Sequence, residues 1–188
     1  MTASPAIETS APDAPAIIGI AGWSGSGKTS LIVDVIPELR RRGYRVATIK
    51  HAHHDFDIDR PNKDSYRHRS AGATEVVVSS AKRWAMMHEN YDEPEPTLAE
   101  IVARLSPTDI VLVEGYKNHR HAKIEVHRPS MGEPLLCTGN ETIVAVAADA
   151  PPLGAPVPVP VLDLNDPAAI VTFILEHCGF GARVEGTI

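Results

Sequence analysis

The chain has 188 residues, which is enough for one α/β domain and short for two. Its formal net charge of -6 gives no overall basic surface of the kind that nucleic-acid binding proteins carry, so we expect no nucleic-acid partner. The two cysteines, Cys137 and Cys178, lack CxxC spacing. This argues against a zinc site or a disulfide framework and favours reduced thiols in a cytoplasmic protein.

Residues 1–15 are rich in Ala, Pro, Ser and Thr and lack the basic start and apolar stretch of a signal peptide. We predict a disordered tail there, followed by a single domain over residues 16–188. Apolar runs in the chain fall short of the ~20 residues that a membrane helix needs. We therefore expect a soluble protein without a membrane partner.

The first predicted elements are a strand, a helix and a second strand. The apolar run at 17–21 predicts a buried strand, and a second strand is predicted at 44–49. Between them, apolar residues at helical spacing predict a helix over 28–42 that Pro37 should kink. These apolar residues are Leu31, Ile32, Val35, Ile36 and Leu39.

Strands and helices then alternate to the end of the chain. Further helices are predicted at 64–71, at about 98–105 and from Asn165-Asp166-Pro167 onward. Further strands are predicted at 74–79, 84–88, 109–114, 123–127, 143–147 and 161–162. The run at 123–127 alternates between polar and apolar residues, so we expect an edge strand there. The pattern predicts an α/β fold, with a mostly parallel twisted sheet and helices on both faces. Together with the motif that follows the first strand, it predicts a P-loop NTPase fold.

One motif follows the first strand directly. Gly22 to Thr29 fits the P-loop pattern G-x-x-x-x-G-K-[ST], and it opens the first predicted helix. The glycines let backbone N–H groups point at phosphate oxygens, Lys28 neutralises the β and γ phosphates, and the Thr29 hydroxyl binds Mg²⁺. We therefore predict nucleoside triphosphate binding by Gly22, Trp23, Ser24, Gly25, Ser26, Gly27, Lys28, Thr29 and Ser30.

A second acidic group is predicted at the end of another strand. The run from Asp109 to Gly115 is apolar and ends in Glu114 and a glycine, which is the form of a Walker B element. Glu114 would lie where the phosphates bind, so it is a candidate for holding magnesium or polarising water. The candidate catalytic residues are therefore Lys28 and Glu114.

The polar stretch over 50–63 allows two interpretations. It contains His51, His53, His54, Asp55, Asp57 and Asp59. These side chains could bind a transition metal, or they could position water and magnesium near the γ-phosphate, which we favour. On the favoured interpretation Asp57 joins Thr29 and Glu114 as a metal ligand, and His51 and His53 face a second ligand.

The basic segment that follows is also open to two interpretations. Lys63, Arg67 and Arg69 could bind a second anion, or they could form a solvated helix face. Lys63 and Arg67 are retained as second-ligand candidates.

Several further segments occur in the order of one known family. They are Thr48-Ile49-Lys50-His51, Asp55 to Asp59, Lys63-Asp64-Ser65 followed by Arg67, Ala71-Gly72-Ala73, and Asp109 to Lys117 with Lys123-Ile124-Glu125-Val126. Together with the P-loop they resemble the molybdopterin-guanine dinucleotide biosynthesis protein B family, MobB. The resemblance covers nearly the whole chain after the N-terminal tail, and this combination is much more specific than the P-loop alone.

The resemblance implies a generally homodimeric protein that binds GTP and Mg²⁺ and is a weak GTPase. It also implies an adaptor role beside the guanylyltransferase that attaches GMP to molybdopterin. The family places the acid near magnesium at Glu114, and it places phosphate binding at Gly25, Gly27, Lys28 and Thr29. Asn62 stands where the family pattern has glycine, and because Asn tolerates left-handed backbone we expect the turn to be kept.

Guanine recognition is weakly encoded. The sequence holds no Asn-Lys-x-Asp element of the Ras kind. Asp149, after the strand at 143–147, is placed where a carboxylate could pair with the guanine N1–H and amino group. A turn aspartate before Pro151-Pro152 explains the same residue equally well.

Two other functions stay open. The first is an ATP-dependent small-molecule kinase, in which the basic segment from Lys63 to Arg69 would hold an anionic acceptor. The second is a metal-delivery GTPase that would bind a transition metal through His51, His53 and His54. The absence of CxxC and of a long His tract counts against the second.

Overall fold

The computed structural model describes residues 14–52, 56–116, 119–152, 154 and 156–180. They divide into two compact units, which are treated separately: unit 1 extends to His51 and resumes at Leu105, and unit 2 is Ala52–Arg104. The single domain predicted over 16–188 spans both units and stays a prediction. Residues 1–13 of the predicted tail lie outside the described residues.

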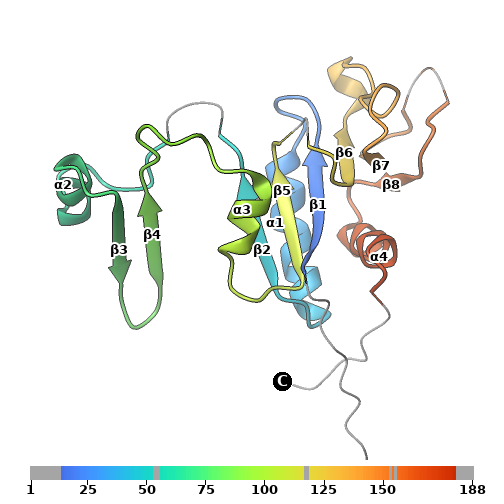
Figure 1. Ribbon diagram of the computed structural model, residues 1–188. Coiled ribbons are helices and arrows are strands. Elements are labelled where there is room, and N and C mark those ends of the chain that lie inside the picture. Colours follow the sequence, from blue (N-terminus) through green and yellow to red (C-terminus); the bar gives the residue numbers. More distant parts are fainter. Residues whose placement is uncertain (1–13, 53–55, 117–118, 153, 155, 181–188) are drawn as a thin grey trace, which may run out of the picture. The chain divides into compact units, whose positions relative to one another are not determined.

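Unit 1 is built on a six-stranded sheet in the order β2-β5-β1-β6-β7-β8 (Figure 1). Every neighbouring pair in it is parallel. The strands are β1 Ala16–Ala21, β2 Val46–Lys50, β5 Ile110–Glu114, β6 Lys123–His127, β7 Ile143–Ala148 and β8 Val161–Asp163. The predicted mostly parallel sheet with helices is therefore confirmed.

Two helices cover one face of this sheet and form its core. They are α1 Lys28–Arg41, which continues through Pro37, and α4 Pro167–His177, which begins where Asp166 accepts a hydrogen bond from Ala169 N over 3.0 Å. Their apolar stripes and the sheet share one buried cluster, in which each fully buried side chain contributes about 1.5–3 kcal/mol. Its members include Ile18, Ile20, Leu31, Val35, Leu39, Leu112, Ile124, Ile170 and Ile174.

Strand β6 lies inside the sheet, between β1 and β7, so the predicted edge strand at 123–127 is wrong. All five of its residues are buried. Its polar side chains are satisfied by loop backbone: Glu125 accepts from Leu136 N (2.8 Å) and Cys137 N (2.9 Å). Lys123 Nζ donates to two loop carbonyls and to Thr142 Oγ1, and burial lowers its pKa. The alternation therefore reflects a polar face covered by loops, because a buried charge must find partners.

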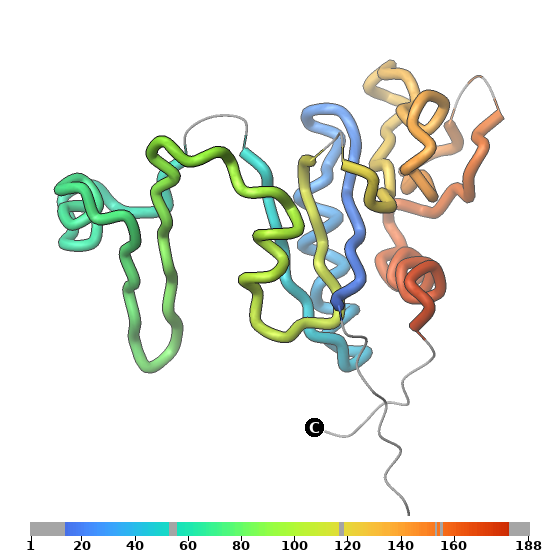
Figure 2. The backbone as a smooth tube through the Cα atoms, in the orientation of Figure 1, coloured from blue at the N-terminus to red at the C-terminus, as the bar shows by residue number. Residues whose placement is uncertain are grey.

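Unit 2 contains a short helix, an antiparallel hairpin and a second short helix (Figure 2). These are α2 Asp64–Ser70, β3 Glu75–Ser79 paired with β4 Trp84–His88, and α3 Leu98–Ala103, which begins with a capping box between Thr97 and Glu100. The hairpin forms a sheet of its own rather than joining the parallel sheet. Asn62 has φ 70, which confirms the left-handed turn expected there. Within the described residues, no helix combines the length and apolarity needed to cross a bilayer.

The lowered pKa of His121 leads us to predict how the free energy of unfolding depends on pH. Burial, followed by the charges of Lys123 and His119, lowers this pKa from 6.5 to about 4. The unfolded chain therefore takes up a proton below pH 6.5 that the folded protein resists until about pH 4. We expect the free energy of unfolding, measured by urea denaturation, to fall between pH 7 and pH 5, and to fall less in His121→Leu. The matched control His68→Gln, on an exposed residue of α2, should keep the full slope, and equal slopes for all three proteins would contradict the prediction.

Candidate functional site: the P-loop and its surroundings

The loop from Gly22 to Gly27 connects the carboxyl end of β1 to α1. Gly22, Gly25 and Gly27 have φ values of 140, 78 and 102, which side chains with a Cβ rarely adopt. A Cβ on Gly22 would lie 2.6 Å from the Val126 carbonyl oxygen and 2.7 Å from Ser26 Oγ. The first glycine is therefore fixed by close contact with β6, and the last is the N-cap of α1. The helix N-terminus faces the loop, which suits an anion.

Lys28 closes the loop from within. Its Nζ donates to the Gly22 carbonyl over 3.1 Å and to the Trp23 carbonyl over 2.8 Å. The Trp23 indole donates to the Pro134 carbonyl over 2.9 Å, which connects the loop to the chain that follows the short 3₁₀ helix Pro129–Met131. The ammonium group of Lys28 thus lies beside the first residues of the loop, where it could contact a phosphate oxygen.

Thr29 and Glu114 meet beside the loop. Thr29 Oγ1 lies 3.2 and 3.1 Å from the two carboxylate oxygens of Glu114, and Lys50 Nζ lies 3.7 Å from Glu114 Oε2. Two neighbouring oxygen ligands of an octahedral Mg²⁺ with bonds of ~2.1 Å lie about 3 Å apart. This hydroxyl and carboxylate therefore fit a magnesium ion with little movement.

A chain of polar contacts connects the P-loop to the carboxyl ends of β6 and β7. Arg128, which follows β6, donates from Nε to the Ser26 carbonyl over 2.9 Å and from Nη1 to Asp149 Oδ2 over 2.5 Å. A Cβ on Gly27 would lie 3.3 Å from Arg128 Nη2, so the guanidinium lies against the loop backbone. Sequence reasoning missed Arg128, although its position directly after a predicted strand was a usable signal.

His51 lies beside Glu114, as expected for a residue that follows β2. Its backbone N–H donates to the Glu114 carbonyl over 2.8 Å, and its ring lies 4.6 Å from the ring of Tyr116. Tyr116 in turn makes an edge contact of 4.8 Å with His119. A Cβ on Gly115 would lie 2.7 Å from His51 Cβ, so this aromatic group packs tightly against the strand end. The role of His51 toward a second ligand stays a prediction.

Other candidates belong to unit 2. Asp57 accepts from Asp59 N (2.9 Å) and from Arg69 Nη2 (2.7 Å), and these two hydrogen bonds lower its pKa. Arg69 also forms an ion pair with Glu89 over 3.1 Å, so both of these acidic partners of Arg69 belong to unit 2. Lys63 is the N-cap residue of α2, and Arg67 is exposed on that helix.

The metal-binding interpretation of the 50–63 loop is not tested by the structure. His53, His54 and Asp55 lie outside the described residues. Across the part of the chain that is described, no three His, Cys, Asp or Glu side chains are placed to hold a metal ion. The ligand roles of Asp57, His53, Lys63 and Arg67 therefore stay predictions.

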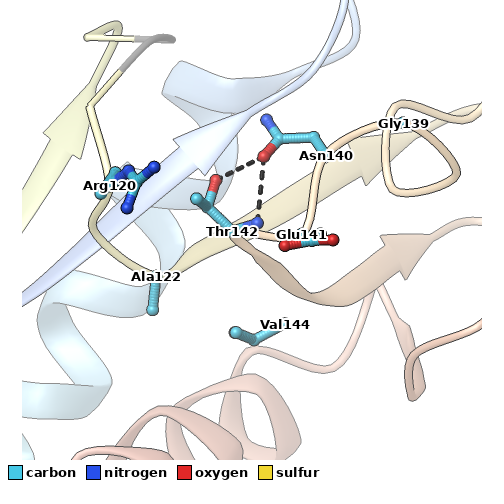
Figure 3. A pocket seen from close by; sticks show the side chains of 7 residues that line it. All are labelled: Arg120, Ala122, Gly139, Asn140, Glu141, Thr142 and Val144. Atoms are coloured by element: carbon cyan, nitrogen blue, oxygen red, sulfur yellow. Dashed lines mark hydrogen bonds between the residues drawn. The ribbon is translucent and has the colours of Figure 1, made fainter.

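A separate hollow of about 560 Å³ lies at the amino-terminal ends of β6 and β7 (Figure 3). Its rim includes Arg120 and Glu141, and Asn140 Oδ1 accepts from Thr142 N (3.0 Å) and Thr142 Oγ1 (2.6 Å). The P-loop follows the carboxyl end of β1, so this hollow lies at the opposite edge of the same parallel sheet.

The glycine loop between β1 and α1, its lysine, and a hydroxyl paired with the acid of the neighbouring strand β5 define the P-loop class of α/β proteins. A family model described as "Molybdopterin guanine dinucleotide synthesis protein B" matches residues 17–149. The chain therefore belongs to the MobB family.

Individual relatives agree with this assignment. The chain is 42% identical over 163 residues to the molybdopterin-guanine dinucleotide biosynthesis adapter protein of Escherichia coli strain K12, covering 85% of this chain and 91% of that protein. The protein of the same name from Haemophilus influenzae is 40% identical, with 89% and 93% covered. A crystal structure described as molybdopterin-guanine biosynthesis protein B is 30% identical, covers 86% of this chain and 99% of that chain, and has a TM-score of 0.66.

Glu114→Gln tests the paired oxygens. The amide keeps the shape but lacks the charge that makes a carboxylate a strong magnesium ligand, so we expect the gain in nucleoside triphosphate affinity on adding Mg²⁺ to fall about tenfold to a hundredfold. Fluorescence titration of a labelled triphosphate with Mg²⁺ and with EDTA measures this gain. Glu141→Gln, at the opposite edge of the sheet, should behave as wild type. An unchanged gain in Glu114→Gln would remove Glu114 from the metal site.

Proposed function

We propose that this protein is a GTP-binding adaptor in the biosynthesis of molybdopterin guanine dinucleotide, and that it has weak GTPase activity. One observation carries the proposal: the P-loop, with Thr29 Oγ1 3.1 Å from Glu114 Oε2, in a chain of the MobB family. The relatives from Escherichia coli and Haemophilus influenzae are named adapter proteins of this biosynthesis, which supports a role beside a partner enzyme. The partner that we propose is the guanylyltransferase that joins GMP to molybdopterin.

GTP would bind across the carboxyl edge of the sheet. Loop N–H groups and the N-terminus of α1 would hold the phosphates, and Lys28 would exchange its contacts to the Gly22 and Trp23 carbonyls for the more negative phosphate oxygens. Thr29 and Glu114 would hold Mg²⁺, which neutralises charge on the phosphates. Asp149, two strands away from β1, would accept the guanine N1–H and amino protons.

Hydrolysis would be slow. Water would attack the γ-phosphorus, the bond to the oxygen that bridges the β and γ phosphates would break, and GDP and phosphate would leave. Arg128, which contacts the P-loop, already donates to the Ser26 carbonyl and to Asp149, so its guanidinium is held by the protein and not directed at the γ-phosphate in this proposal. P-loop GTPases without an arginine finger turn over at about 10⁻⁴–10⁻³ s⁻¹, and we expect a rate in this range.

We also propose a homodimer, formed through one face of the hairpin in unit 2. Val77, Trp84 and Met86 lie on the same face, with exposed fractions of 59%, 63% and 44%. A two-stranded hairpin is marginally stable alone, and a contiguous apolar face on a small sheet is typical of an interface. A second copy of this chain would cover it with an identical face.

A GTP-dependent adaptor of this kind would act in the cytoplasm. Both cysteines are free thiols, with Cys137 buried. Burial raises the pKa of each thiol, which keeps it protonated and unreactive. Reduced, inert cysteines suit a reducing compartment.

Nucleotide titration tests the central proposal. With Mg²⁺ present, the protein should bind a fluorescent GTP analogue at least tenfold more tightly than the ATP analogue. Lys28→Ala should weaken GTP binding by about a hundredfold, because one charged contact to phosphate contributes ~1.5–3 kcal/mol. Lys82→Ala, on an exposed lysine in unit 2, is the matched control. Equal or preferred ATP binding would favour the kinase alternative, and undiminished binding in Lys28→Ala would mean that the P-loop does not hold the nucleotide.

The mass of the protein in solution tests whether the hairpin face forms the dimer interface. Sedimentation equilibrium should give about twice the chain mass of 20.2 kDa for the wild type and the monomer mass for Trp84→Glu, since a buried unpaired charge opposes association. Val33→Glu changes an equally exposed apolar residue of α1 and should stay dimeric. A dimer that survives Trp84→Glu would place the interface elsewhere.

A further inference from the structure

The ion pair between Arg128 and Asp149 joins the P-loop to the carboxylate that we propose meets the base. Arg128 is about one-third exposed, and its Nε and Nη1 donate to acceptors on two different loops: the Ser26 carbonyl and Asp149 Oδ2. Ser26 belongs to the phosphate loop, and Asp149 follows β7, the second strand out from β1 on that side. One planar group therefore connects the part of the site that meets phosphates to the carboxylate proposed to meet the base.

We propose that Arg128 is a specificity-determining positioning residue: it fixes the Asp149 carboxylate relative to the P-loop, so that guanine is read at a set distance from the phosphates. The inference rests on the proposed function and deepens it. Arg128 itself touches neither base nor phosphate in this proposal, and it acts through Asp149 and Ser26.

The geometry suits arginine in particular. A guanidinium holds its donors in one rigid plane, so bonds from Nε and Nη1 fix the directions of both acceptors, whereas a lysine ammonium donates from a single point on a flexible stem. Close packing restricts the plane further, because Nη2 lies 3.3 Å from the position of a Cβ on Gly27. The last loop glycine thus serves two purposes, since it allows φ 102 and leaves room for Arg128.

The ion pair leaves the carboxylate competent to accept from a base. Arg128 uses Asp149 Oδ2, and each carboxylate oxygen has two acceptor sites, so Oδ1 and the second site on Oδ2 stay available for the guanine N1–H and amino group. The Asp149 side chain keeps about a quarter of its surface exposed, which a base can reach. A mispositioned carboxylate would lose one of the two guanine bonds first, and that loss is measurable as specificity.

The experiment compares GTP with ITP, which lacks the 2-amino group, on the full chain with Mg²⁺. Affinities are measured for wild type, Arg128→Gln, Asp149→Asn and the double variant, with Arg120→Gln at the opposite edge of the sheet as control (Figure 3). Each single variant should weaken GTP binding about tenfold to a hundredfold and ITP binding much less, so the preference for GTP falls toward one. The double variant should be no worse than the worse single variant, because both changes act on one carboxylate.

Different outcomes separate the two levels of the proposal. If wild type prefers GTP over ITP and Arg128→Gln weakens both ligands equally, Arg128 is a brace of the loop and the inference fails while the proposed function stands. Unchanged or increased preference in Arg128→Gln, or additive losses in the double variant, would overturn it as well. If wild type binds neither ligand, or binds ATP better than GTP, the proposed function itself fails. Circular dichroism melting of every variant confirms that each is folded.

Discussion

The site depends on one constraint: the strands of unit 1 are parallel, so their carboxyl ends reach the same edge of the sheet. The register pairs Ile20 of β1 with Glu114 of β5, which sets the acid beside the start of the P-loop. On the other side of β1, the Val126 carbonyl of β6 lies so close to Gly22 that a Cβ there would approach it to 2.6 Å. The loop is thus held between its two neighbouring strands, and the residues that follow those strands are the ones able to reach a bound phosphate.

Strand β6 shows how a buried polar face supports this arrangement. Glu125 binds two loop N–H groups and Lys123 three loop acceptors, so the chain before and after the strand is attached to its buried face. Both side chains are buried, and a buried charge is tolerated only when it is hydrogen-bonded, so these contacts hold the loops to the strand. A strand held in this way presents the residue after it, Arg128, from a fixed position. Lys123 and Glu125 therefore contribute to the site by holding the strand that precedes Arg128.

The parts of the molecule that sequence could predict are those encoded by contiguous residues. The P-loop motif, the apolar strands beside it and the start of α4 at Asp166 each depend on neighbours in the chain, and the structure has these strands and this helix start as expected. The position of β6 could not be predicted, because alternation describes which side chains are polar and not whether loops cover them. Arg128 and Asp149 are 21 residues apart and meet through the sheet order β1-β6-β7, which no local pattern specifies.

The order of the strands separates the groups suited to any nucleoside triphosphate from those that we propose select the base. The P-loop after β1, the start of α1 and the end of β5 supply the lysine and the paired hydroxyl and acid. Any nucleoside triphosphate could use these groups, so they do not select a base. In the proposed function, base selection falls to residues that lie farther along the same edge, after β6 and β7. Asp149 is the acceptor that we propose there, and a carboxylate on a surface turn rotates freely unless something holds it. Arg128 supplies that restraint, and because its other bond is to Ser26, the restraint is set against the loop that fixes the rest of the nucleotide.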